Sequence, residues 1–173
     1  MFRARNMEKL YIVMLGGRHP RAFIELHDVA FVFAEHLQQT IPALQQHWFG
    51  QSKGLHIDSW LIVDGVDGYQ VRKHSQRAAA QDPKLYFVNF GGYFPGNFGE
   101  EHSYELVVAP NAQLAKEIAK TRRNPHWIKP HTDFLADIDD CIELTELGGH
   151  FVQLVPAAHL PIEIHHDYLV IGD

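Results

Sequence analysis

Residues 9–34, KLYIVMLGGRHPRAFIELHDVAFVFA, recur without a gap as residues 84–109, KLYFVNFGGYFPGNFGEEHSYELVVA. The two stretches share 12 identities in 26 positions, which is far more than chance produces. A match of the chain with itself at a fixed offset indicates a repeated structural unit. We therefore predict that the chain contains two copies of one unit.

Each copy begins with two predicted strands. Residues 10–15 form a continuous apolar run, which is typical of a strand buried on both faces. Residues 25–34 form the second strand, and its copy alternates, with Tyr104, Leu106 and Val108 on one face. This alternation assigns every residue of the second strand to one of two faces.

A helix follows the second strand of each copy. In the second copy Asn111 is the predicted N-cap, and Leu114 and Ile118 form the apolar stripe. In the first copy the apolar residues between 37 and 48 have helical spacing, and Pro42 either kinks that helix or marks the first turn of a shorter one. One helix covers only one face of a sheet, so each copy has apolar surface left to bury against its twin.

A hairpin closes each copy, around residues 65–68 in the first and around Gly148 and Gly149 in the second. The predicted fold class is α+β, with internally duplicated ββαββ units, pseudo-twofold symmetry and mostly antiparallel or mixed sheets in one compact body. In the tail, residues 168–171 are a candidate edge strand. The predicted segments are an N-terminal extension, a first repeat unit, a connector, a second repeat unit and a C-terminal tail, at 1–8, 9–73, 74–83, 84–156 and 157–173.

The composition excludes several classes of protein. The chain has 173 residues, of which 46% are hydrophobic and 21% charged, as is typical of a globular protein with a real core. Its 15 basic and 21 acidic residues give a net charge of −6, which argues against nucleic acid and membrane partners. The N-terminus lacks the apolar segment of a secretory signal, so a cytoplasmic location is expected. The single Cys141 follows two aspartates and is predicted to be structural.

Two kinds of polar pair recur in both copies, Glu-x-His at the start of the second strand and His-x-Asp before the third. The pairs are Glu25 with His27, Glu100 with His102, His56 with Asp58, and His131 with Asp133. The same offset relates Asp64 to Asp139. By period two, Glu100 and His102 share the apolar, inward-looking face of their strand, where such groups need partners.

Two hypotheses explain these pairs. In the first, each unit builds a small-molecule or transition-metal site, with histidine available as an acid or base. The candidate catalytic residues are then His27, His102, Glu25 and Glu100, and the candidate ligand-binding residues are His56, Asp58, His131 and Asp133. In the second, the pairs are internal staples, in which Glu25 and Glu100 accept hydrogen bonds from backbone N–H groups of their own glycine loops, and the chain is a non-catalytic module that binds a partner or another copy of itself. Whether the chain is an enzyme, and which metal it binds, stay open at this point.

The loops after the first strands are further candidates for binding. Their glycines let backbone N–H groups approach a ligand, and they are Gly16, Gly17, Gly91 and Gly92. In the first loop Arg18 and Arg21 are candidates for holding an anionic group, the alternative being a solvated basic turn. The chain has no Walker, dinucleotide, G-x-S-x-G or H-E-x-x-H motif, so the enzyme classes that these motifs define lack their signatures.

Four stretches carry a resemblance to a known family. They are LGGRHPRAFIELHDVAFVF and HIDSWLIVDGVDGYQV in the first copy, and NFGGYFPGNFGEEHSYELVVA and HTDFLADIDD in the second. They resemble a bacterial family known as a domain of unknown function, number 1543, over nearly all of residues 9–156. The resemblance implies a two-copy member and a small bacterial cytoplasmic protein, and it transfers neither an activity nor a catalytic residue.

Overall fold

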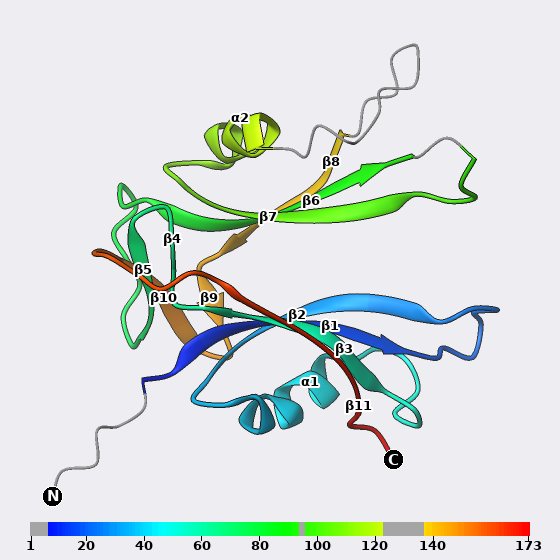
Figure 1. Cartoon of the computed structure of the whole chain (residues 1–173). Coiled ribbons are helices and arrows are strands. Elements are labelled where there is room, and N and C mark those ends of the chain that lie inside the picture. Colours follow the sequence, from blue (N-terminus) through cyan, green and yellow to red (C-terminus); the bar gives the residue numbers. More distant parts are fainter. Residues whose placement is uncertain (1–6, 94–95, 123–136) are drawn as a thin grey trace, which may run out of the picture. The chain divides into compact units, whose positions relative to one another are not determined.

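The computed structural model describes residues 7–93, 96–122 and 137–173 and shows an α+β fold with antiparallel sheets and few helices (Figure 1). The elements are β1 (Lys9–Gly17), β2 (Leu26–Ala34), η1 (Leu37–Thr40), α1 (Ile41–His47), β3 (His56–Val63), β4 (Gly65–Val66), β5 (Tyr69–His74), β6 (Lys84–Gly92), β7 (Glu101–Ala109), α2 (Ala112–Arg122), β8 (Asp137–Leu144), β9 (Glu146–Leu147), β10 (His150–Pro156) and β11 (Glu163–Val170). The chain divides into two compact units, Met1–Arg77 with Glu146–Asp173, and Ala78–Thr145. Within the described ranges, no helix is long and apolar enough to cross a membrane.

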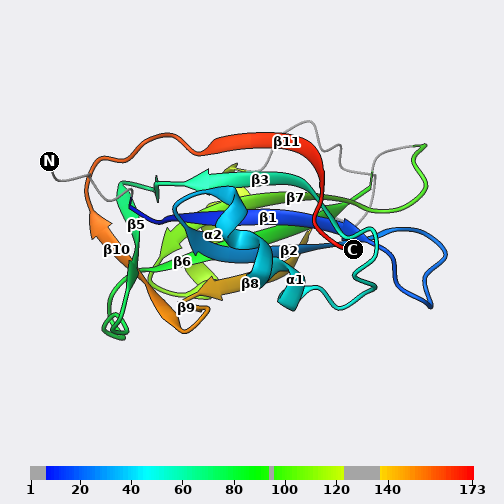
Figure 2. The same cartoon turned by 90° about the horizontal axis from the view of Figure 1, so that it is seen from below.

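Strand β1 organises the first unit, because it pairs with a strand on each edge. It lies between β2 and β3, and β11 extends the sheet beyond β3, which gives the order β11-β3-β1-β2 (Figure 2). Its central position explains the continuous apolar run, since Leu10 and Val13 point to opposite faces and both are fully buried. The expected tail strand is present as β11, which begins five residues earlier than predicted.

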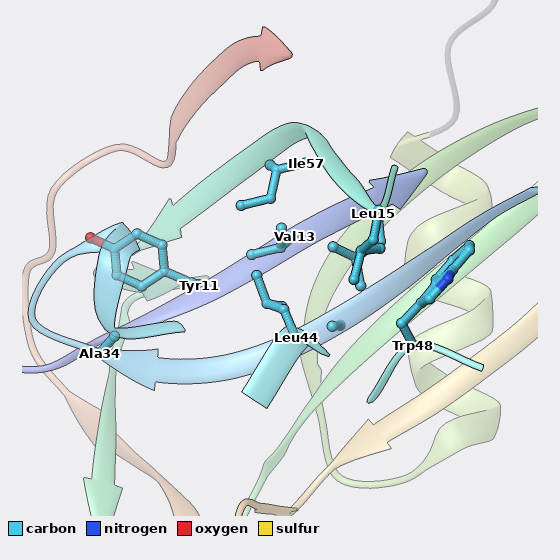
Figure 3. Close-up of a cluster of buried hydrophobic side chains, with 9 residues drawn as sticks. Tyr11, Val13, Leu15, Ala34, Leu44, Trp48 and Ile57 are labelled. Carbon is cyan, nitrogen blue, oxygen red and sulfur yellow. The ribbon is translucent and has the colours of Figure 1, made fainter. Parts of the chain in front are cut away.

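Helix α1 covers one face of this sheet. Leu44 of α1 and the neighbouring Trp48 pack on Leu15 and Ile57 of the strands (Figure 3). Pro42 lies in the first turn of α1, where its missing N–H group leaves no hydrogen bond unmade. Of the two predicted roles of Pro42, the structure therefore shows the first turn of a short helix.

The opposite face of the sheet carries polar residues at one end. Gly16 of β1 pairs with His27 of β2 on one side and with His56 of β3 on the other. The register of β1 against β3 shifts at the Met14–Leu15 step, which makes Asp58 an extra residue of β3. A β-bulge of this kind bends the strand and redirects a side chain.

The closing hairpins differ from the prediction. Strands β4 and β5 are joined at Asp67 and Gly68, whose positive φ values of 53° and 82° suit a type I′ turn. Strands β9 and β10 form the counterpart, joined at Gly148 and Gly149. Because β10 pairs with β5, the β9–β10 hairpin belongs to the first unit, whereas the sequence had placed it in a second unit ending at residue 156.

The second unit consists of the sheet β7-β6-β8 and helix α2. The predicted N-cap is confirmed, because the Leu114 N–H donates to Oδ1 of Asn111 at 2.9 Å. The predicted stripe is only partly right, since Ala115 and Ala119 are fully buried and Ile118 packs beside them, whereas Leu114 is 40% exposed. Small alanines at the contact let the helix lie close to the sheet.

The face predicted to look inward in β7 is not the one that α2 covers. Val107 and Ala109 belong to the core with α2, so by period two His102 and Tyr104 lie on the other face. The His102 side chain is 40% exposed and Tyr104 is 42% exposed. The expectation of a buried, inward-looking His102 is therefore wrong, because the buried part of that face begins only at Leu106.

Asp64 connects distant parts of the first unit. Its side chain is 10% exposed, accepts hydrogen bonds from Nζ of Lys9 and, at 2.8 Å, from the N–H of Leu160, and lies 3.6 Å from a guanidinium nitrogen of Arg72. Burial acts to raise the pKa of this carboxyl group. The hydrogen bonds from Lys9 and Leu160 and the charges of Lys9 and Arg72 outweigh burial and hold the pKa below its ordinary value.

We expect Asp64→Asn to lower the free energy of unfolding at pH 7 by about 1–3 kcal/mol, since it weakens hydrogen bonds to a charged group. A lowered folded-state pKa means that the stabilisation is complete above the unfolded-state value of about 4 and is lost as the pH falls through the folded-state value. Urea unfolding at stepwise lower pH measures it, with the exposed Asp167→Asn as control. A difference in the free energy of unfolding between wild type and Asp64→Asn that stays constant below pH 4 would contradict this account.

Candidate functional site

Four of the predicted site residues come together around Gly16 in the first unit. Glu25 directly precedes β2, His27 lies in β2, and His56 and Asp58 lie in β3. The pairing of Gly16 with both His27 and His56 brings the two strands' side chains to the same place. We call Glu25, His27, His56 and Asp58 the first cluster.

Imidazole nitrogens and carboxylate oxygens alternate around the first cluster. Nε2 of His27 lies 3.3 Å from Oδ2 of Asp58 and 3.8 Å from Oε2 of Glu25. Nε2 of His56 lies 3.4 Å from Oδ1 of Asp58 and 3.5 Å from Oε1 of Glu25. Each imidazole therefore faces both carboxylates, which is the arrangement expected if a proton or a metal ion lies between them.

His56 is the buried member of the first cluster. Its side chain is 1% exposed, whereas those of Asp58, Glu25 and His27 are 32%, 40% and 50% exposed. Nδ1 of His56 lies 2.9 Å from the carbonyl oxygen of Gly54, which only accepts, so Nδ1 carries a proton and, in the neutral imidazole, Nε2 carries a lone pair. Within the described part of the chain, Nε2 of His56 and Oδ2 of Asp58 are buried without a hydrogen-bond partner. Buried polar atoms of this kind are uncommon and need an explanation.

Glycine at position 16 leaves the space that the first cluster fills. A Cβ atom on Gly16 would collide with Nε2 of His56 and would lie 2.7 Å from Oδ2 of Asp58. On another side of His56, the ring of Tyr168 lies with its centroid 4.2 Å from the imidazole centroid. Gly17 has a different role, because a Cβ there would lie 2.8 Å from the indole of Trp48.

A similar set of side chains surrounds Gly91 in the second unit. One donor atom each from Glu100, His102 and Asp139 lie within 4.8 Å of one another, and all three residues are exposed. Nδ1 of His102 lies 3.4 Å from Oδ2 of Asp139 and 3.2 Å from Oδ1 of Asn89. A Cβ atom on Gly91 would collide with Oδ2 of Asp139 and lie 2.5 Å from Oε1 of Glu100. We call Glu100, His102 and Asp139 the second cluster.

Asp139 is a site residue that the sequence analysis missed. The register of β6 against β8 shifts between Asn89 and Phe90, so Asp139 is the extra residue of β8, as Asp58 is of β3. The offset of 75 is therefore wrong in this strand, where it had matched Asp139 with Asp64.

The same register places Asp137 opposite Gly91, where β3 has His56 opposite Gly16. The predicted His131 and Asp133 lie outside the described residues. Matching the two hairpin turns, 67–68 with 148–149, instead of keeping a constant offset, would have found Asp139.

The remaining candidates lie outside both clusters. Arg18 and Arg21 are exposed, and their backbone groups hold the loop. The Gln51 N–H donates to the Arg18 carbonyl at 2.7 Å, and the Arg21 N–H donates to Nδ1 of His19 at 3.2 Å. Gly92 pairs with Glu101 of the neighbouring strand. No described contact brings either guanidinium group to the first cluster.

Cys141 does not have the properties of a nucleophile. Burial raises the pKa of its thiol, and the charge of Lys116 lowers it by less, so the net pKa lies above its ordinary value. A raised pKa reduces the thiolate fraction at neutral pH. This result agrees with the structural role predicted from the sequence.

Comparisons with known proteins place this geometry in a family. Residues 22–72 match the family model described as Domain of Unknown Function (DUF1543), and this segment contains the whole first cluster. The crystal structure of a protein Il1583 from Idiomarina loihiensis is similar, with a TM-score of 0.74 and 33% sequence identity over 96% of this chain and 99% of that chain. No curated protein was found to match the sequence.

We expect Gly16→Ala to lower the free energy of unfolding by about 1–3 kcal/mol, because the new methyl group overpacks the site. It should also move the imidazole resonances of His56 in an NMR spectrum. Gly17→Ala is the matched control, since its methyl group displaces Trp48 instead and should leave those resonances in place. Unchanged His56 resonances in Gly16→Ala would show that the first cluster does not rest on this glycine.

Proposed function

Because this chain belongs to the family described as Domain of Unknown Function (DUF1543), its function has to be inferred from its own side chains, and we propose that the first cluster binds a divalent transition-metal ion. Two imidazoles and two carboxylates form a donor set that suits zinc, manganese or iron. All four donors come from or next to two strands that pair with β1, so the fold holds them at one place.

The observation that carries this proposal is the buried Nε2 atom of His56. Its lone pair faces carboxylate oxygens of Glu25 and Asp58 at 3.5 and 3.4 Å, and these atoms repel one another unless a cation or a proton lies between them. The contact between Nδ1 of His56 and the Gly54 carbonyl is of the kind that orients metal-binding histidines. A metal ion would therefore satisfy a buried group that the described residues leave unsatisfied.

The spacing of the first cluster supports the same proposal. Ligand atoms about 2.0–2.2 Å from one ion are about 3.3–3.6 Å apart along the edges of a tetrahedron. Each imidazole Nε2 atom lies 3.3–3.8 Å from one oxygen of each carboxylate, and because His27 and His56 face different oxygens of Glu25 and of Asp58, one ion would bind a single oxygen of each carboxylate or both of them. The atoms that face each other across the ring must also approach, and the half-exposed side chains of Glu25 and His27 have the freedom to do so.

A catalytic role is the second part of the proposal. A divalent ion supplies Lewis acidity and lowers the pKa of bound water. Glu25 lies on the exposed side of the first cluster, where the carboxylate oxygen that does not bind the ion can accept or return a proton of a molecule held there. His27, also on the exposed side, binds the ion through Nε2. The His56 side chain is only 1% exposed, so it does not contact a molecule that approaches from solvent, and its role is to bind the ion.

The competing function is that of an internal staple. If both imidazoles of the first cluster carry two protons, each Nε2 atom can donate to the carboxylates of Glu25 and Asp58. The alternation of imidazoles and carboxylates therefore fits an internal staple as well as a metal site. The staple hypothesis, however, requires hydrogen bonds from the glycine loops to the Glu25 and Glu100 carboxylates. Within the described residues, neither carboxylate receives one from its own loop.

Several finer predictions stand beside this proposal. We propose that the two units arose by duplication of one ββαββ module, with the two-copy organisation and segments predicted above. The equal registers of Gly16 with His27 and of Gly91 with His102 support duplication. We also propose that it is a bacterial, cytoplasmic protein that does not bind nucleic acid, because of its net charge of −6 and its family resemblance. A small-molecule ligand belongs to the first of the two hypotheses above, and assembly into a homo-oligomer belongs to the staple hypothesis.

The test is metal analysis and calorimetric titration of the tag-free chain with ZnCl2 and MnCl2. We expect a tightly bound equivalent that His56→Ala weakens by at least about 100-fold, since a buried ligand is removed. His47→Ala is the matched control, because His47 also lies 3.0 Å from an aspartate, Asp28, but outside the cluster.

Asp58→Asn, which keeps the side-chain shape, covers the case in which His56→Ala fails to fold. Wild-type protein that binds neither metal, together with a large loss of stability in His56→Ala, would overturn the metal proposal and leave the staple.

A further inference from the structure

Tyr168 of β11 packs on the buried histidine of the first cluster. Strand β11 lies at the edge of its sheet, beside β3 (Figure 2). The ring centroid of Tyr168 lies 4.2 Å from that of the His56 imidazole, with 34° between the two ring planes. His56 is 1% exposed, whereas Tyr168 is 63% exposed. The tyrosine therefore shields His56 with part of its ring and leaves the rest of the ring open to solvent.

A β-bulge places Tyr168 at this point of the sheet. The register of β11 against β3 shifts after His166, so that two residues of β11 lie opposite the single Asp58 of β3, and Tyr168 is one of the two. Bulges redirect side chains and are common next to active sites. Asp58 is also the extra residue of β3 against β1. The irregularity that supplies Asp58 to the first cluster therefore coincides with the one that supplies Tyr168.

Val170 extends the apolar surface along β11. It pairs with His56 across the two strands, which puts both side chains on the same face of the sheet, and it is 59% exposed. We call Tyr168 and Val170 the apolar wall. Small-molecule sites typically combine apolar and aromatic lining with a few polar groups that fix the orientation of the ligand. The apolar wall and the first cluster together form this combination.

The end of β11 is anchored to the loop that orients His56. The N–H groups of Ile171 and Gly172 donate to the carbonyl oxygen of Leu55 at 2.9 and 3.0 Å. Leu55 directly follows the residue whose carbonyl oxygen contacts Nδ1 of His56. The apolar wall is therefore held in place by the fold itself, and a preorganised surface loses less entropy when it binds a ligand.

A molecule held by a metal ion at the first cluster would reach the apolar wall. An ion about 2.1 Å from Nε2 of His56 lies about 3.3 Å from the centroid of the imidazole ring. Because the Tyr168 centroid lies 4.2 Å from the same imidazole centroid, the ion and the centre of the tyrosine ring are at most about 7.5 Å apart. One planar ring attached directly to a metal-binding head spans this distance.

We propose that Tyr168 is a specificity-determining residue of the first cluster, whose ligands are planar or aromatic organic molecules with an oxygen-donor head. The head binds the ion from the side of the half-exposed Glu25 and His27, and the planar body stacks on Tyr168. Zinc accepts a fifth ligand and manganese a sixth, so four protein ligands leave a position for the head. This inference rests on the proposed function, because the ion holds the head, and it adds the class of molecule bound.

Two hydroxamates that share one metal-binding head test this proposal, acetohydroxamate with a methyl group and benzohydroxamate with a phenyl group. Calorimetry measures their affinities for the full chain, loaded with one equivalent of zinc or manganese, whichever it binds more tightly. We expect Tyr168→Ala to lower the ratio of the benzohydroxamate affinity to the acetohydroxamate affinity by about tenfold, because the stacking partner is lost. Tyr168→Phe, which keeps the ring, should retain the wild-type ratio.

Ile164→Ala is the matched control, because Ile164 lies on the same strand and is equally exposed, at 63%, but pairs with Leu61, away from the first cluster. Tyr168→Leu, which keeps an apolar side chain over His56, covers the case in which Tyr168→Ala fails to fold. An unchanged ratio in the variant without the ring would overturn the proposal, as would an equal loss in Ile164→Ala.

Metal affinity, measured on the same proteins, separates this inference from the proposed function. Tyr168 does not bind the ion in this account, so Tyr168→Ala should bind the metal as tightly as the wild type does. If metal binding is intact and the ratio does not depend on Tyr168, this inference fails and the proposed function stands. If the wild type binds neither metal, the proposed function fails and this inference fails with it.

Discussion

The burial of β1 on both faces is the constraint on which the rest of the structure depends. Paired on both edges and apolar from Leu10 to Leu15, this strand leaves no room for a polar side chain along most of its length. The exception is its glycine end, where Gly16 carries no side chain and the neighbouring strands project imidazoles and carboxylates over it. The first cluster is therefore a consequence of where the apolar run of β1 ends.

The repeated motif predicted much of the fold and part of the site. The apolar runs, the short helix with Pro42 and the cap at Asn111 follow from local patterns, which the structure shows. The pairing of β10 with β5 does not follow from local patterns, because contacts between residues that are distant in the sequence decide which strand edge is paired. Leu114 was misassigned because alanines, which carry little hydrophobic signal, make the contact of α2 instead.

A difference in length between the two copies explains why one half of the site was found and the other was not. The site hypothesis predicted that the pair Glu25 and His27 converges with the pair His56 and Asp58, and the two pairs do come together. Asp139 occupies the position of Asp58, because β8 and β3 carry their extra residue at corresponding steps. The second copy has six more residues between its glycine pair and this bulge than the first, so the offset changes from 75 to 81 and a constant offset misses Asp139.

The central claim is that Nε2 of His56 binds a metal ion. X-ray absorption at the zinc edge, on the wild-type chain and on His56→Ala, each loaded with one equivalent of zinc, tests it directly. The account predicts a first shell of nitrogen and oxygen at about 2.0–2.2 Å, with the outer-shell scattering of two imidazole rings. A shell of oxygen alone, with no imidazole scattering, would contradict it and would indicate that protons, and not a metal ion, lie between the imidazoles and carboxylates of the first cluster.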